Sequence, residues 1–316
     1  MDADRYRLSE AEHQEVFERD IKPDLFAGAK SSDRPVAVIF GGQPGAGKSA
    51  AVDAVLRDLA PHGGAVQIIG DQLRSYHPAY GSLMRADDKT AAFYTDKDSG
   101  RWVEKSIAYA RKNRWNLVIE GTMRSPAVVA ATMQSLRQAG YEIDARALAV
   151  NERVSWQGVM QRYEEQKADR GVGRMTAPHS HRDAYNGMPK TLERIERECL
   201  ADRVSIYRRG GQRIYSNELQ AGQWKAPPQA SQVLEAERAR PMTPQERTAY
   251  AEAYGKLALQ ISRPERGASA DELRTMRELL AQAERELEAE AGGPATLIAQ
   301  AKELITGAIE KGRGKT

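Results

Sequence analysis

Four short apolar runs in the first half of the chain alternate with segments whose apolar residues recur at helical spacing. The runs cover residues 36–40, 65–69, 115–120 and 145–150. Runs of this length, separated by helices, are typical of buried parallel strands. The pattern therefore predicts an α/β fold with a mostly parallel central sheet flanked by helices.

The polar positions between these runs predict the connecting elements. Ser9 and Glu12 form a capping box that starts a first helix, and Pro126 suits the first turn of another. Residues 87–100 are polar, so we expect the next helix to begin only after them. The remaining predicted elements are helices over 101–111, 154–167 and 188–202, a basic loop over 169–181, and paired strands over 204–208 and 213–216.

A change in composition divides the chain near residue 220. Residues 220–228 are rich in Gly and Pro, and beyond them Ala, Glu, Arg and Leu dominate, which is typical of helices. Thr243 and Ser269 each open a capping box ahead of an amphipathic helix, and a third apolar stripe follows. We predict two domains: an α/β domain over 1–220, and a helical extension over 221–316 suited to a three-helix regulatory or docking unit.

The composition is that of an ordinary globular protein, with 41% hydrophobic and 29% charged residues. The formal net charge of +3 is too small to indicate nucleic-acid binding. No apolar run is long enough to span a membrane, and the first residues lack the apolar core of a signal peptide. The single cysteine, Cys199, suits a reducing compartment. We therefore expect a cytoplasmic protein without a nucleic-acid or membrane partner.

The first apolar run leads into a glycine-rich segment that fits the pattern G-x-x-x-x-G-K-[ST]. A strand before it and a helical pattern after it supply the context that this phosphate-binding loop, the P-loop, requires. Glycines let the backbone wrap a polyphosphate, whose oxygens bind loop N–H groups and the helix N-terminus. The lysine contacts the β- and γ-phosphates, and the following hydroxyl is a ligand of Mg²⁺. The predicted ATP site comprises Gly42, Gln43, Pro44, Gly45, Ala46, Gly47, Lys48 and Ser49, with Ser49 as the metal ligand.

Acidic residues follow the second and third predicted strands. Asp71 lies just beyond the second strand, and Glu120 ends the third, with Thr122 and Arg124 after it. The carboxyl ends of parallel strands open on the ligand crevice of an α/β sheet, so we expect these side chains beside the P-loop. A carboxylate there could accept the proton of a hydroxyl that attacks a phosphate. For Asp71 alone, the competing interpretation is the N-cap of a helix.

Two arginines lie further along the chain, Arg162 in a predicted helix and Arg174 in the basic loop after it. Arginines on a segment separate from the P-loop suit a lid that closes over phosphates. By composition alone, a solvated charged surface is the better interpretation for either arginine.

Taken together, these motifs resemble the zeta toxin family, the kinase toxins of bacterial toxin–antitoxin systems. The resemblance covers residues 9–217 and rests on Gly-Gly-Gln-Pro-Gly-Ala-Gly-Lys-Ser, Glu-Gly-Thr-x-Arg and Arg-Tyr-Glu-Glu, in the family's order. It implies a P-loop kinase fold and the transfer of phosphate from ATP, with Mg²⁺, to the 3′-hydroxyl of the amino sugar of UDP-N-acetylglucosamine. The product of that reaction cannot serve cell-wall synthesis.

The resemblance also implies roles for single residues. Lys48 and Ser49 would handle the phosphates and Mg²⁺, and Asp71 would be the base at the sugar hydroxyl. The other implied residues are Glu104, Glu120, Thr122 and Arg124 at the sugar nucleotide, and Arg162 and Arg174 at the transferred phosphoryl group.

Several alternatives stay open. The acceptor could be another nucleotide sugar, a small metabolite or a polynucleotide end, or the protein could be a regulator that binds ATP without transfer, against which Asp71 argues. Residues beyond 220 have no counterpart in the compact toxins of the family, whose antitoxins are small three-helix proteins that obstruct the ATP site. Residues 243–311 could therefore regulate in cis, dock a separate antitoxin that acts in trans, or only stabilise the fold.

Overall fold

The computed structural model describes residues 2–290 and 295–313, which pack into two compact units. The first, here the sheet unit, consists of Met1–Trp156 and Arg174–Ala239. The second, here the helical unit, consists of Gln157–Gly173 and Arg240–Thr316.

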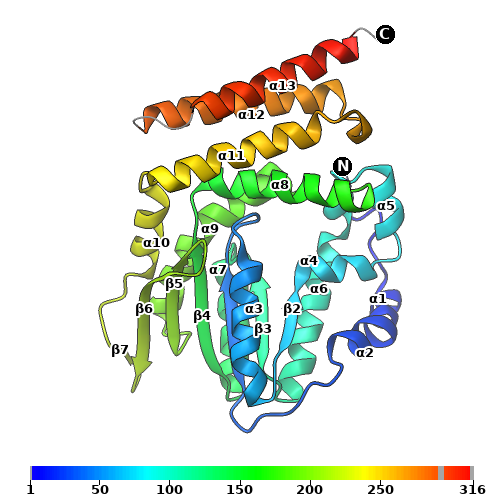
Figure 1. Cartoon of the computed structure of the whole chain (residues 1–316). Coiled ribbons are helices and arrows are strands. Elements are labelled where there is room, and N and C mark those ends of the chain that lie inside the picture. Colours follow the sequence, from blue (N-terminus) through cyan, green and yellow to red (C-terminus); the bar gives the residue numbers. More distant parts are fainter. Residues whose placement is uncertain (1, 291–294, 314–316) are drawn as a thin grey trace. The chain divides into compact units, whose positions relative to one another are not determined.

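A seven-stranded sheet forms the centre of the sheet unit (Figure 1). Its order is β2-β3-β1-β4-β5-β6-β7; the first five strands are parallel, and β6 and β7 join antiparallel. This confirms the predicted, mostly parallel α/β sheet. The strands are β1 Val36–Gly41, β2 Val66–Ile69, β3 Leu117–Gly121, β4 Glu142–Ala149, β5 Arg203–Arg208, β6 Arg213–Gln220 and β7 Gln223–Trp224.

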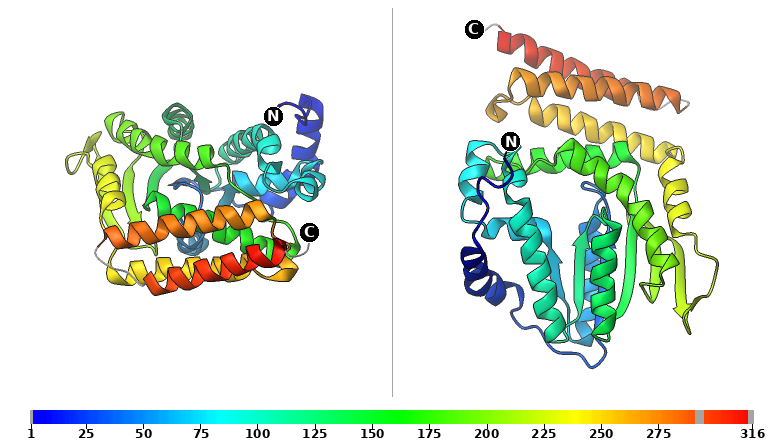
Figure 2. Two further views of the ribbon diagram at one scale, coloured as in Figure 1. Left: turned by 90° about the horizontal axis from the view of Figure 1, so that it is seen from above. Right: turned by 180° about the vertical axis from the view of Figure 1, so that it is seen from behind.

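Helices cover both faces of the sheet. Helix α3 lies in front of it in Figure 1, and α6 and α7 lie in front when the unit is seen from behind in Figure 2. The helices of this unit are α1 Glu10–Val16, α2 Lys22–Leu25, α3 Lys48–Leu59, α4 Gly70–Leu73, α5 Tyr80–Ala86, α6 Ala91–Lys112, α7 Pro126–Gln138, α9 Pro178–Arg197 and α10 Ala230–Ala239, and α8 Glu152–Arg170 begins in it.

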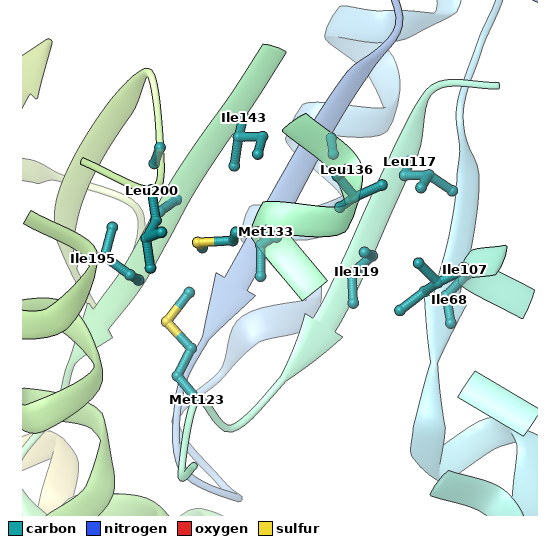
Figure 3. Packing of buried hydrophobic residues seen from close by; sticks show 14 of the residues in the cluster. Ile68, Ile107, Leu117, Ile119, Met123, Met133, Leu136, Ile143, Ile195 and Leu200 are labelled. Carbon is teal, nitrogen blue, oxygen red and sulfur yellow. The ribbon is translucent and has the colours of Figure 1, made fainter. Parts of the chain in front are cut away.

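Successive residues of the strands point to opposite faces and build two cores. In β1, Val38 and Phe40 pack with α3, whereas Ala37 and Ile39 belong to the larger core on the other face. Figure 3 shows Met133 and Leu136 of α7 in that larger core, among Ile119, Ile143 and Leu200. Because both faces of the sheet are buried, its strands are continuous apolar runs in the sequence.

Helix α6 begins at Ala91, so the prediction that a helix begins only after residue 100 was wrong. Several polar residues of its first turns are buried with partners, whereas Asp96 and Lys97 are exposed. Asp98 accepts a hydrogen bond from the Leu8 backbone N–H at 3.1 Å, and Ser99 Oγ donates to the Gly70 carbonyl at 2.6 Å. Contacts with distant segments, rather than apolar periodicity, place the start of this helix.

Helix α9 also begins earlier than predicted, at Pro178 inside the expected basic loop. Proline suits the first turn of a helix, because its missing N–H would have no partner there. Helix α9 ends at Arg197, whereas the predicted helix over 188–202 ends later in the chain. Residues 171–177 remain between α8 and α9 without regular structure.

Helix α10 lies in the predicted helical extension, before the three helices named there, and it extends the sheet unit beyond residue 220. Ala230 and Leu234 are fully buried in the larger core, and Glu196 of α9 accepts the Ala230 backbone N–H at 2.9 Å. Arg208 of β5 pairs with Glu237 of α10 through two hydrogen bonds of 2.9 Å. The compact unit therefore ends at Ala239, whereas the predicted domains meet at residue 220.

The helical unit contains the second part of α8 together with α11 Pro244–Ile261, α12 Ala270–Ala289 and α13 Ala295–Arg313. The capping boxes predicted at Thr243 and Ser269 are confirmed, because each side chain accepts the backbone N–H three residues later. Helix α13 packs against both α11 and α12. No helix in the described residues combines the length and apolar character needed to cross a bilayer.

Candidate active site

The P-loop connects β1 to α3, as the motif predicts. Gly45 and Gly47 have φ angles of 77° and 86°, a left-handed conformation that an L side chain would strain, and Gly47 is the N-cap residue of α3. Gly42 is needed for a second reason, since a Cβ there would lie 3.0 Å from the Lys48 side chain. The loop backbone therefore favours glycine at 45 and 47, and a side chain at position 42 would press on Lys48.

Lys48 lies in the first turn of α3 and is mostly buried, with 10% of its side chain exposed. Its Nζ donates to the Gly42 carbonyl at 2.8 Å and lies 3.7 Å from Oε1 of Glu120. Glu120 stands on β3 opposite Phe40 of β1 and Ile69 of β2, so the sheet register brings it to the P-loop. The acid predicted at the end of the third strand thus meets the P-loop lysine.

Gln43 anchors the P-loop from inside the protein. Its side chain is fully buried, and its Nε2 donates to the Val150 carbonyl at 2.7 Å and to Ser155 Oγ at 3.1 Å. Its Oε1 accepts from Arg238 of α10 at 3.0 Å. The sequence motif allows any residue at this position, so only the structure reveals its role.

Asp71 lies in α4, directly after β2, and about half of its side chain is exposed. Its Oδ1 is 2.8 Å from Nη1 of Arg174 and 3.3 Å from Nε of Arg74. The structure therefore joins two predicted site residues that lie far apart in the sequence. Ile69 is the N-cap residue of α4 and Asp71 lies within the first turn, so Asp71 does not occupy the N-cap position that the alternative interpretation gave it.

Arg74 and Asp96 are charged residues of this region that sequence reasoning missed. Arg74 is nearly buried and donates to Oδ1 of Asp96 at 2.5 Å and to the Ala92 carbonyl at 2.7 Å. Burial opposes its charge, but Asp71 and Asp96 outweigh this and raise the pKa of Arg74. Asp96 also lies 3.5 Å from Nη2 of the predicted site residue Arg124. The only signal in the sequence was that Arg74 follows Asp71 by one helical turn.

The loop after β3 carries Thr122 and Arg124, and α9 holds its backbone in place. Met123 has a φ angle of 50° and is buried, and its carbonyl accepts from Thr191 Oγ1 at 2.7 Å. A Cβ on Gly187 would lie 2.1 Å from the Arg124 carbonyl, so α9 approaches this loop as closely as a backbone can. Thr122 is half-buried and Arg124 is exposed, at the end of the sheet where the P-loop lies.

Two further predicted residues lie on helices α6 and α8. Glu104 is exposed on α6, in the sheet unit. Arg162 lies on the part of α8 that belongs to the helical unit. The roles of both residues stay predictions.

The donor groups at the loop fit a magnesium ion. Mg²⁺ usually keeps several waters and takes one or two protein oxygens besides substrate phosphates. Ser49 offers an exposed hydroxyl at the start of α3, and the Glu120 carboxylate lies beside Lys48. No cluster of three or more His, Cys, Asp or Glu able to hold a metal occurs in the described residues, and a metal bound mainly by phosphates needs none.

His181 supports the P-loop from α9 and makes stability depend on pH. Its Nε2 lies 2.9 Å from Ser155 Oγ, the same hydroxyl that Gln43 contacts. Burial, together with the charges of Arg238 and Arg182, lowers the pKa of His181 to about 4. The unfolded chain takes up this proton near pH 6.5, so the contribution to stability is complete above that pH and is lost as the pH falls towards 4.

We therefore expect the free energy of unfolding to fall by about 2 kcal/mol between pH 7 and pH 5 because of His181. Denaturant titrations at both pH values measure this difference, and His181→Gln should flatten it. His179→Gln is the matched control, since that side chain is exposed on the same helix. An equal pH dependence in His181→Gln and in the parent protein would contradict the prediction.

The fold and these contacts define a class of protein. A parallel sheet whose first strand leads through a glycine-rich loop into a helix, with acids at the ends of the neighbouring strands, is a P-loop kinase fold. A family model for the zeta toxin matches residues 23–220, and the chain belongs to this family of toxin kinases.

The relatives agree with this assignment. Toxin PezT of Streptococcus pneumoniae serotype 4 is 31% identical over 219 residues, which cover 69% of this chain and 85% of that protein. Toxin zeta of Enterococcus hirae is 31% identical over 195 residues, 61% of this chain and 68% of that protein. A solved structure from the PezAT chromosomal toxin–antitoxin system of Streptococcus pneumoniae matches with a TM-score of 0.66 and 26% identity, over 80% of this chain and 98% of that chain.

Proposed function

We propose that this toxin kinase transfers the γ-phosphoryl group of ATP to the 3′-hydroxyl of the amino sugar of UDP-N-acetylglucosamine. The observation that carries the proposal is Asp71, a half-exposed carboxylate 2.8 Å from Arg174, following a strand of the sheet that also carries the P-loop. A proton acceptor beside a cation is what phosphoryl transfer to a hydroxyl needs. Membership of the zeta toxin family supports the sugar nucleotide as the acceptor.

The proposed mechanism assigns one task to each group. Lys48 binds the β- and γ-phosphates, and Asp71 takes the proton of the sugar hydroxyl. The hydroxyl oxygen bonds to the γ-phosphorus while the bond from that phosphorus to the β,γ-bridging oxygen breaks, which releases ADP. Arg174 neutralises the negative charge that develops on the transferred phosphoryl group. An arginine in this role raises the rate by about 10³-fold or more. Ser49, together with the phosphates, would hold Mg²⁺, which would supply further positive charge at the phosphate oxygens.

The remaining predicted residues complete the proposal. Membership of the family also supports a role for Arg162 at the transferred phosphoryl group. It supports contacts with the sugar nucleotide for Glu104, Glu120, Thr122 and Arg124. Arg74 pairs with both Asp71 and Asp96, and Asp96 also lies 3.5 Å from Arg124, so these charges link Asp71 to Arg124.

We further propose that a small helical antitoxin binds this protein in trans. The matched structure from the PezAT toxin–antitoxin system supports such a partner. The alternative, regulation in cis by the helices beyond residue 240, predicts that the purified chain alone is inactive. Turnover of ATP by the purified chain without any partner would contradict regulation in cis.

Mass spectrometry of the nucleotide sugar tests the activity. Incubation with ATP, Mg²⁺ and UDP-N-acetylglucosamine should add one phosphate to the sugar nucleotide, and Lys48→Ala should abolish the product, because the β- and γ-phosphates lose their cation. Arg57→Ala serves as the control, since this exposed side chain lies on the same helix. ATP turnover without a modified sugar would reject this acceptor, and other nucleotide sugars would be tested next.

A further inference from the structure

Arg238 is a buried arginine on α10, outside the residues that the family model matches. Only 3% of it is exposed. Its Nη2 donates to Oε1 of Gln43 in the P-loop at 3.0 Å, and its Nη1 donates to the Tyr185 carbonyl at 2.8 Å. The guanidinium carbon lies 4.0 Å from the centre of the Tyr185 ring.

The positive charge of Arg238 has only neutral partners in the described residues. They are an amide oxygen, a carbonyl oxygen, an aromatic ring and the sulfur of Met188 at 3.6 Å. Glu152 and Glu235 lie beyond ion-pair distance and act on the charge of Arg238 only through the longer-range field. The Nε atom of Arg238 is buried and has no hydrogen-bond partner among the described residues. Burial lowers the pKa of Arg238 to about 10, which still leaves it charged at neutral pH.

A buried cation without a carboxylate partner is costly, because desolvation is not repaid by an ion pair. Buried, strongly perturbed charges of this kind cluster at functional sites. Here the side chain of Gln43 connects the charge of Arg238 to the P-loop. The polyphosphate that this loop would bind carries several negative charges. An interaction between charges through the protein interior is weakly screened by salt.

We propose that Arg238 is a positioning residue of the nucleotide site, which fixes Gln43 of the P-loop and whose buried charge is balanced by the bound polyphosphate. This inference rests on the proposed function only in requiring that the P-loop bind ATP. Gln43 then has bonds to α10, to the residue after β4 and to α8, so the loop is held in its binding conformation before the phosphates arrive. Helix α10 is thereby a part of the kinase site.

Three substitutions separate charge, hydrogen bonding and volume. Arg238→Lys keeps the charge, Arg238→Gln keeps a donor for Gln43, and Arg238→Met keeps only the apolar volume. We would measure the Kd of ATP and of inorganic tripolyphosphate by calorimetry at low and high salt. The unfolding temperature of each protein without nucleotide is the second readout.

We expect Arg238→Gln and Arg238→Met to raise the Kd of both ligands about tenfold, or 1.4 kcal/mol, at either salt concentration. Arg238→Lys should stay within about threefold of the parent protein. The unfolding temperatures without nucleotide should change little, because loss of a buried charge offsets the loss of its hydrogen bonds.

Two results would overturn the inference. Unchanged affinity for tripolyphosphate in Arg238→Met would remove any role at the nucleotide site. A fall in unfolding temperature that accounts for the whole loss of binding, in all three variants alike, would leave a structural role only. Failure of the parent protein to bind ATP would instead contradict the proposed function, so the two failures can be told apart.

Discussion

Replacing Asp71 with asparagine is expected to lower the rate of phosphoryl transfer by about 10²- to 10⁴-fold, with the Kd of ATP within about twofold of the parent value. The amide cannot accept the proton of the attacking hydroxyl, whereas the P-loop contacts lie on other elements. Stability should change by less than about 1 kcal/mol, because the carboxylate is half-exposed and Arg74 keeps its bond to Asp96.

Single-turnover kinetics with ATP and the sugar nucleotide measure the rate, and calorimetry measures the affinity for ATP. Asp53→Asn is the matched control, since its carboxylate is exposed on α3 and the substitution is the same. A rate within tenfold of the parent value would mean that Asp71 is not the base and only pairs with the two arginines. Equal losses of rate and of ATP affinity would show that the site itself is disturbed.

Replacing Arg266 with methionine is expected to destabilise the helical unit by about 3–5 kcal/mol. Arg266 forms two hydrogen bonds with the Glu164 carboxylate, of 2.7 and 3.0 Å, and a third with Glu272 at 2.9 Å. Glu164 lies on α8 with 2% of its side chain exposed, so it would be left as a buried charge without its cation. Glu272 belongs to the capping box of α12 and holds the arginine from the other side.

Hydrogen exchange over residues 157–173 and 244–289 measures the loss where it occurs, since the two units need not unfold together. The double variant Glu164→Met with Arg266→Met should recover most of the stability, because apolar side chains of similar volume replace a buried ion pair well. Arg274→Met is the control, as its ion pair with Asp271 is exposed and worth less than about 1 kcal/mol. Similar exchange in Arg266→Met and Arg274→Met would contradict the prediction.

The Arg266 variant also bears on catalysis. Arg162 lies on α8 two positions before Glu164, in the motif Arg-Tyr-Glu-Glu. If Arg162 stabilises the transferred phosphoryl group as proposed, loosening this helix should lower kcat more than it raises the KM for ATP. The C-terminal helices would then support the reaction, in contrast to the inhibitory role open to a regulator in cis.

The sequence by itself determined the parts of this protein that depend on local chemistry. The strand, loop and helix around Lys48 follow from apolar runs and from glycines that alone tolerate the φ angles of Gly45 and Gly47. The capping boxes at Ser9, Thr243 and Ser269 were equally predictable, because a cap joins residues only three apart. Family membership followed from the order of such motifs.

Only the tertiary structure decided the contacts between distant segments. The start of α6 depends on the buried partners of Asp98 and Ser99, which no periodicity along the helix reveals. Gln43 and Arg238 are 195 residues apart, and neither lies in a pattern that points to the other. Hydrophobic periodicity specifies which face of an element is buried, but the pairing of polar groups depends on how those faces pack. The charged surroundings of the active site therefore became visible only in the folded chain.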